Sequence, residues 1–183
     1  MQPRARRHLA ALGGVFVWLV TLILEACMAL PVRAQADEVD RLLAGMSTTQ
    51  KVAQLFMVSL WGEVLTLDGA DFLARYQPGG VIFFGDNFRT PEQITRLTND
   101  IQAAIVARPG AVPAWMATDQ EGGPVSRLAD AEPGAFTTFP VSMAVAATGD
   151  PAYAQSIGLA MAEELRAVGI TMNLAPVADV ETN

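Results

Sequence analysis

The sequence predicts an α/β fold in which parallel strands alternate with helices. Short apolar runs of strand length recur along the chain, and segments with helical spacing of their apolar residues separate them. Several of these runs end abruptly in acids, glycines or prolines. Strands that alternate with helices form βαβ units, which place the strands in one parallel sheet and the helices outside it.

The first residues differ from the rest of the chain and predict a secretory signal peptide over residues 1–36. Three arginines within the first seven residues precede the apolar stretch 13–30, and Ala34 and Ala36 follow it. A basic head, an apolar middle and a small-x-small exit are typical of a removable export signal. We therefore expect cleavage after Ala36 and a periplasmic or extracellular location for residues 37–183.

An uncleaved membrane anchor is the alternative for this segment. The apolar stretch approaches the roughly 18–20 residues that span a bilayer, but Glu25 interrupts it and is costly at mid-membrane. The residues around Cys27 loosely resemble a lipoprotein cleavage box, although the acid at Glu25 argues against lipidation. Contact with a membrane is expected only through this segment.

Removal of residues 1–36 changes what the composition implies. The chain's one cysteine, Cys27, and its one histidine, His8, both lie in that segment. The remainder therefore excludes disulfides, the usual structural zinc sites, a cysteine nucleophile and a Ser-His-Asp triad. No metal ion and no organic cofactor is expected.

The charge of the exported part is strongly negative. The whole chain has a net charge of −7, and without residues 1–36 it has eight basic and eighteen acidic residues, a net charge of −10. Such a surface repels phosphate backbones, so nucleic acid is not an expected partner. The remaining 147 residues suffice for one hydrophobic core.

The first half of residues 37–183 predicts two strands, each preceded by a helix. Ser47 and Gln50 have the spacing of a capping box and open a short helix before a strand at 55–60. Helical spacing over 68–76 ends at Pro78 and two glycines, and a second strand follows at 81–84.

The second half repeats this order. Thr90 and Pro91 are typical of a helix start, and the next helix has isoleucine or leucine at 94, 97, 101 and 105 on one face. A third strand is expected at 115–118. A helix from Pro151 to Gly169, with apolar residues at 157, 161, 165 and 168, precedes a fourth strand at 170–175.

The stretch 119–127, Asp-Gln-Glu-Gly-Gly-Pro-Val-Ser-Arg, is the best candidate for a functional site. Asp119 follows the third strand directly, Gly122 and Gly123 allow a tight turn, and Arg127 can return to the same cavity. A carboxylate and a guanidinium together suit a ligand rich in hydroxyl groups. The alternative is a structural turn capped by Asp119, with Arg127 paired to a neighbouring acid.

Acids follow three successive predicted strands. Asp86, Asp119 and Asp179 come after the second, third and fourth strands, and the carboxyl ends of strands are the usual address of a site in a β/α barrel. The apolar residues within the strands are interpreted as core, including Met116, Met172, Leu174 and the phenylalanines at 83 and 84.

Six motifs in the same order give the chain a family resemblance. They occupy residues 51–57, 79–85, 119–127, 147–150, 163–166 and 173–179. From about residue 45 to the end, the chain resembles the amino-terminal barrel of glycoside hydrolase family 3, in particular its bacterial β-N-acetylhexosaminidase branch. The resemblance implies that residues 37–183 form the first half, about four β/α units, of a TIM-type (β/α)8 barrel.

The resemblance also implies a function. It suggests an exported, retaining, exo-acting glycosidase with a carbohydrate substrate, such as terminal β-linked N-acetylglucosamine in cell-wall fragments. Asp119 would bind hydroxyls of the terminal sugar, Arg127 would share that subsite, and Asp179 would lie near the pocket. A β-glucosidase-type member of the family, a catalytically silent sugar-binding half-barrel and a non-functional remnant are the alternatives.

The family's catalytic groups lie outside the matching motifs. A retaining glycosidase needs two carboxyl-type or equivalent groups about 5–5.5 Å apart. In the family the nucleophilic aspartate and the acid/base loop belong to later barrel units, so the resemblance implies no catalytic residue within this chain. We expect either a piece of a longer protein or a half-barrel that pairs with a second copy or another chain.

Overall fold

The computed structural model describes residues 38–108 and 110–179, and the chain divides into two compact units, Met1–Met46 and Ser47–Asn183. In the first unit residues 38–45 are helical, and Arg41 pairs with Glu38 one turn away. The expected signal peptide lies outside the described residues. Within the described ranges, none of the helices combines the length and the apolar character that a membrane crossing requires.

The second unit contains a parallel sheet of four strands in the order β1-β2-β3-β6. The strands are β1 (Met57–Ser59), β2 (Gly80–Phe83), β3 (Trp115–Thr118) and β6 (Met172–Asn173). Every neighbouring pair is parallel, so all four carboxyl ends meet at one edge of the sheet. The predicted α/β class, the strand order along the chain and the parallel pairing are confirmed.

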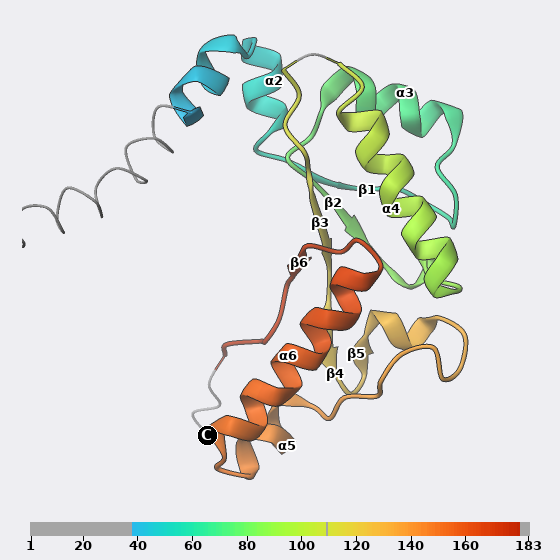
Figure 1. The fold of residues 1–183 in the computed structure, drawn as a ribbon, viewed down its shortest axis with the longest axis vertical. Coiled ribbons are helices and arrows are strands. Elements are labelled where there is room, and N and C mark those ends of the chain that lie inside the picture. Colours follow the sequence, from blue (N-terminus) through green and yellow to red (C-terminus); the bar gives the residue numbers. More distant parts are fainter. Residues whose placement is uncertain (1–37, 109, 180–183) are drawn as a thin grey trace, which may run out of the picture. The chain divides into compact units, whose positions relative to one another are not determined.

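Helices and a hairpin connect these strands (Figure 1). The helices are α2 (Thr48–Ala53), α3 (Leu67–Tyr76), α4 (Pro91–Ile105), α5 (Ser142–Ala147) and α6 (Pro151–Ala167). Short 3-10 helices η1 (Gly85–Asn87) and η2 (Arg127–Asp130) follow β2 and the hairpin. The hairpin consists of β4 (Gln120–Gly122) and β5 (Val125–Ser126), which pair antiparallel.

The helix starts follow the predicted signals. At α2, Ser47 and Gln50 form the reciprocal hydrogen bonds of a capping box. At α4, the Thr90 hydroxyl accepts from the backbone N–H of Gln93, and proline occupies the first turn. The four apolar positions predicted for one face of α4 are all at most 3% exposed, because they pack on the sheet.

Two of the strands, β1 and β6, are shorter than the apolar runs that predicted them. Leu55 and Phe56 precede β1 and are exposed, and Leu174 follows β6 and is also exposed. The interpretation of Leu174 as core is therefore wrong, and Met172 is only half-buried. The interpretation of Phe84 as core is also wrong. Because β2 ends at Phe83, the Phe84 side chain lies beyond the end of the strand and is exposed.

Candidate functional site

Asp119 lies at the carboxyl end of the third strand. Thr118 ends β3 fully buried, and its hydroxyl donates to the carbonyl oxygen of Phe83 at 3.0 Å. Asp119 follows directly and is half-buried. Because β3 is flanked by β2 and β6, Asp119 follows a strand that has a neighbour on each side.

The β4–β5 hairpin brings Arg127 back to Asp119. Gly122 and Gly123 have positive φ angles of 90° and 61°. Residues that have a Cβ adopt such angles only at a cost in conformational energy. The hairpin reverses there, and the backbone N–H of Arg127 donates to the carbonyl oxygen of Asp119 at 3.3 Å. The sequence predicted a turn with a returning arginine, but it did not reveal that the turn is a paired hairpin.

The Arg127 side chain is half-buried and unpaired within the part of the chain that the structure describes. Its guanidinium carbon lies 5.9 Å from the centre of the Phe84 ring, in a cation–π arrangement. Its Nε is buried and has no hydrogen-bond partner. The described ion pairs join Arg41 to Glu38 and Arg89 to Glu63, so the structural alternative, in which Arg127 pairs with a neighbouring acid, is not observed.

Asp86 and Asp179 make no hydrogen bond to Asp119 or Arg127 among the described residues. Asp179 lies six residues beyond β6 and is exposed, and no hydrogen bond joins it to another described residue. Asp86 is also exposed and accepts a hydrogen bond from the backbone N–H of Gly62 at 3.3 Å. The structure therefore brings Asp119 and Arg127 together, whereas neither of the other two acids joins them through hydrogen bonds.

A buried polar network holds the hairpin in place, and no sequence pattern predicted it. Gln120 is fully buried, and its side chain donates to Ser126 Oγ at 2.9 Å and accepts from the backbone N–H of Leu128 at 3.1 Å. Its backbone is bonded to the side-chain amide of Asn173 on β6. The available signal for Asn173 was an amide side chain in the predicted strand 170–175, where Thr171 is the only other polar residue.

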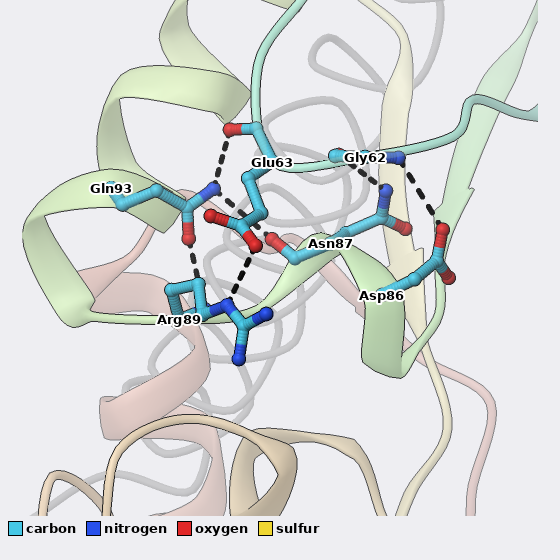
Figure 2. Close-up of polar contacts among 6 residues, drawn as sticks. All are labelled: Gly62, Glu63, Asp86, Asn87, Arg89 and Gln93. Atoms are coloured by element: carbon cyan, nitrogen blue, oxygen red, sulfur yellow. Dashed lines mark hydrogen bonds and ion pairs between the residues drawn. The ribbon is translucent and has the colours of Figure 1, made fainter.

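A second polar cluster fastens the loop after β1 to the loop after β2 (Figure 2). Asn87 is 1% exposed, and its amide donates to the carbonyl oxygens of Leu60 and Gly62, both at 2.9 Å. Gln93 donates to the carbonyl oxygen of Glu63 at 2.6 Å, and the Glu63 carboxylate pairs with Arg89 Nε at 2.6 Å. These contacts fix two neighbouring loops at the same edge of the sheet as Asp119.

A cavity of about 550 Å³ lies beside the candidate site rather than in it. Its walls are mostly apolar and come from α5, α6, β6 and the first two residues of the hairpin. Neither Asp119 nor Arg127 lines it, so it does not identify the ligand of these two residues. Among the described residues, no three acids, histidines or cysteines cluster closely enough to hold a metal ion.

The parallel βα units, with Asp119 and Arg127 following the third strand, define part of a β/α barrel whose candidate site lies at the carboxyl ends of the strands. Residues 47–183 match the family described as glycosyl hydrolase family 3 N terminal domain. The chain belongs to glycoside hydrolase family 3.

Similar proteins agree with this assignment. A β-hexosaminidase from Alkalilimnicola ehrlichii is 38% identical over 130 residues, which cover 68% of this chain and 35% of that protein. A solved family 3 β-N-acetylglucosaminidase from Paenibacillus sp. is 36% identical, with a TM-score of 0.66, over 72% of this chain and 24% of that one. The β-N-acetylhexosaminidase of Beutenbergia cavernae is 35% identical, with a TM-score of 0.65, over 75% of this chain and 40% of that one.

The predicted resemblance to family 3 and to its β-N-acetylhexosaminidase branch is thus confirmed. The matches to the first three curated relatives span between 19% and 36% of those proteins. The structure likewise contains four parallel strands of the eight in a complete (β/α)8 barrel.

Proposed function

We propose that this chain forms the sugar-binding half of a retaining, exo-acting glycosidase that removes terminal β-linked N-acetylglucosamine or a related sugar. In this proposal Asp119 and Arg127 bind adjacent hydroxyl groups of the terminal sugar. Asp179 has a secondary place near the same sugar. The proposal assigns no nucleophile and no proton donor to this chain.

One observation carries the proposal: Asp119 and Arg127 are joined through their backbones, yet their side chains keep free hydrogen-bonding capacity. Neither side chain makes a hydrogen bond or an ion pair within residues 38–108 and 110–179. A half-buried charge without a partner is unfavourable unless a ligand or water satisfies it. Hydroxyl groups suit both, since a carboxylate accepts their protons and a guanidinium donates to their oxygens.

The neighbourhood also suits a sugar. Phe84 supports the guanidinium from one side, which limits the positions that its N–H groups can take. Charge-assisted hydrogen bonds in a sheltered site contribute about 1.5–3 kcal/mol each. Relatives whose names state a β-N-acetylhexosaminidase or β-N-acetylglucosaminidase activity support N-acetylglucosamine as the first sugar to test.

Calorimetric titration of the full chain with N-acetylglucosamine tests the proposal. We expect measurable binding that Asp119→Asn weakens roughly tenfold to a hundredfold, because the carboxylate loses its charge-assisted bonds. Glu92→Gln makes the same change of charge on the exposed face of α4 and should leave binding unchanged. Absence of binding by the unaltered chain, or equal binding by the Asp119 variant, would refute the assignment.

A complementary assay addresses catalysis. The chain should release no p-nitrophenol from the aryl N-acetyl-β-glucosaminide, because the proposal places the bond-breaking groups elsewhere. Turnover that is abolished by Asp119→Ala would mean that this aspartate is itself a catalytic group and that its role has been misassigned.

We also propose that the protein is exported, on the basis of the order of residues 1–36 alone. Mass spectrometry of the protein recovered from a bacterial host should find an amino terminus at Asp37. An intact amino terminus in the membrane fraction would favour the anchored alternative.

A further inference from the structure

We propose that Asn173 on β6 is a positioning residue, whose side-chain amide fixes Asp119 and Arg127 relative to each other. The inference rests on the proposed sugar-binding role of these two residues. Asn173 touches neither of them through its side-chain amide. It acts instead through the backbone of Gln120, which lies between them in the hydrogen-bonded network.

The contact between Asn173 and Gln120 has two hydrogen bonds. Asn173 Oδ1 accepts from the backbone N–H of Gln120 at 3.0 Å, and Asn173 Nδ2 donates to the carbonyl oxygen of Gln120 at 2.9 Å. Backbone pairing between β3 and β6 ends with the bond from Leu174 N–H to the carbonyl oxygen of Thr118. The Asn173 side chain thus continues the pairing beyond the last paired residue of β3.

This contact fixes one particular peptide plane. The N–H of Gln120 and the carbonyl of Asp119 belong to the same planar peptide group. Asn173 binds that group through its N–H, and the backbone N–H of Arg127 binds it through its carbonyl oxygen at 3.3 Å. Because both edges of the plane are held, the direction in which the Asp119 side chain leaves the backbone is also restricted.

The Gln120 side chain extends the restraint to both neighbours of Arg127. It donates to Ser126 Oγ on one side and accepts from the backbone N–H of Leu128 on the other. Gln120 is fully buried and Ser126 is 8% exposed, so water does not compete freely for these bonds. We call Asn173, Gln120 and Ser126 the amide clamp.

The other end of β3 provides a matched control. Gln102 on α4 donates to the carbonyl oxygen of Ala114 at 2.8 Å and accepts from its backbone N–H at 3.1 Å. This is the same two-bond contact between a side-chain amide and one residue's backbone. It lies at the amino end of the strand, away from Asp119. A purely structural role predicts similar effects of removing either amide, whereas a positioning role does not.

The experiment compares Asn173→Ala with Gln102→Ala in the full chain. Amide hydrogen exchange is measured by NMR at Gln120, Arg127 and Leu128, and binding of N-acetylglucosamine is measured by calorimetry. We expect Asn173→Ala to speed exchange at these amides and to weaken sugar binding, each by about tenfold. The two substitutions should lower the melting temperature by similar amounts. Gln102→Ala, however, should leave amide exchange at these residues and sugar binding unchanged.

Distinct outcomes refute the clamp and the sugar site. If Asn173→Ala leaves exchange at Arg127 and Leu128 as in the unaltered chain, or if Gln102→Ala weakens binding as much, the positioning role is overturned. If the unaltered chain binds no sugar, the proposed function fails, and the exchange comparison alone decides whether Asn173 fixes this geometry.

A second variant guards against loss of folding. Asn173→Asp has the same shape, retains the acceptor for the Gln120 N–H and loses the donor to its carbonyl oxygen. We expect protection at Arg127 and sugar affinity below those of the unaltered chain, because a carboxylate oxygen without a proton then faces the carbonyl oxygen of Gln120. Full retention of both in Asn173→Asp would show that the second hydrogen bond, and with it the two-bond clamp, is irrelevant.

Discussion

Helices α4 and α6 were predicted from the same kind of apolar stripe, but their environments differ. Each begins with a side-chain cap followed by proline, and each has apolar residues at helical spacing. The face of α4 is sealed, since Ile94, Ile101 and Ile105 are all 0% exposed. On α6, only Met161 and Leu165 are buried.

The different burial of the apolar faces of α4 and α6 results from the strands that they face rather than from the helices themselves. α4 lies beside α3 (Figure 1), and its stripe packs in the main core cluster together with residues of β2 and β3. α6 faces β6, which has two residues, and the wall of the 550 Å³ cavity includes Ile157 and Met161. An amphipathic pattern therefore predicts which face of a helix is apolar, while the length of the neighbouring strand decides how much of that face is buried.

The largest expected effect comes from making the same substitution, isoleucine to alanine, on α4 and on α6. Ile101→Ala on α4 should lower the free energy of unfolding by about 2–5 kcal/mol, because it opens a void in a closed core. Ile157→Ala on α6 removes the same atoms from the wall of an existing cavity, so we expect a loss of about 1 kcal/mol or less. Urea denaturation followed by circular dichroism measures both, and equal losses would contradict the comparison.

Local patterns predicted α4 well, because everything that defines it is close in the sequence. Thr90, Pro91 and the four buried apolar positions lie within sixteen residues, and the observed helix begins at Pro91 as expected and ends at Ile105. The third strand was predicted with its observed bounds for the same reason, since it is a short run that lies between two neighbouring strands and is buried from Met116 to Thr118.

Features that depend on distant partners were not predicted. Phe84 and Leu174 have apolar side chains like those of the core, and only the ends of their strands determine that they are exposed. The amide clamp joins Gln120 to Asn173 across 53 positions, and no local period marks such a pair. The acid and arginine of the site were found because a short glycine turn brings them together within nine residues.

A substitution at Gly122 tests how much the packing of the hairpin contributes to stability on the α6 side of the sheet, where the helix is less buried than α4. A Cβ added at Gly122, where φ is 90°, would collide with the carbonyl oxygen of Pro140. Gly122→Ala should therefore cost roughly 2–3 kcal/mol of unfolding free energy, from a strained backbone and a displaced segment. It should also weaken sugar binding, because the hairpin positions Arg127.

Gly134→Ala is the matched control for this strain. Gly134 also has a positive φ, of 81°, but a Cβ there would meet nothing within 4 Å. We expect a loss of about 1 kcal/mol from the conformation alone and no effect on sugar binding. Equal losses for the two variants in thermal denaturation would show that the contact between the hairpin and Pro140 contributes nothing.

The smallest expected effect comes from the two helix caps. The Thr90 hydroxyl accepts from the backbone N–H of Gln93 at 3.2 Å, and an Asp150 carboxylate oxygen accepts from that of Ala152 at 2.9 Å. Replacement of either cap by alanine removes about 1 kcal/mol from its helix. For Thr90→Ala the loss should appear in global unfolding, because α4 cannot open without exposing the core.

Asp150→Ala should behave differently, because residues 151–156 of α6 are all exposed. That end can open without disturbing the core, so we expect faster amide exchange over the first turns of α6 and a melting temperature almost unchanged. Ser156→Ala, on the same exposed end, should alter neither measurement appreciably. If Asp150→Ala lowers the melting temperature as much as Thr90→Ala does, the exposed end of α6 unfolds only with the core, and the difference between the two helices is one of burial without a difference in stability.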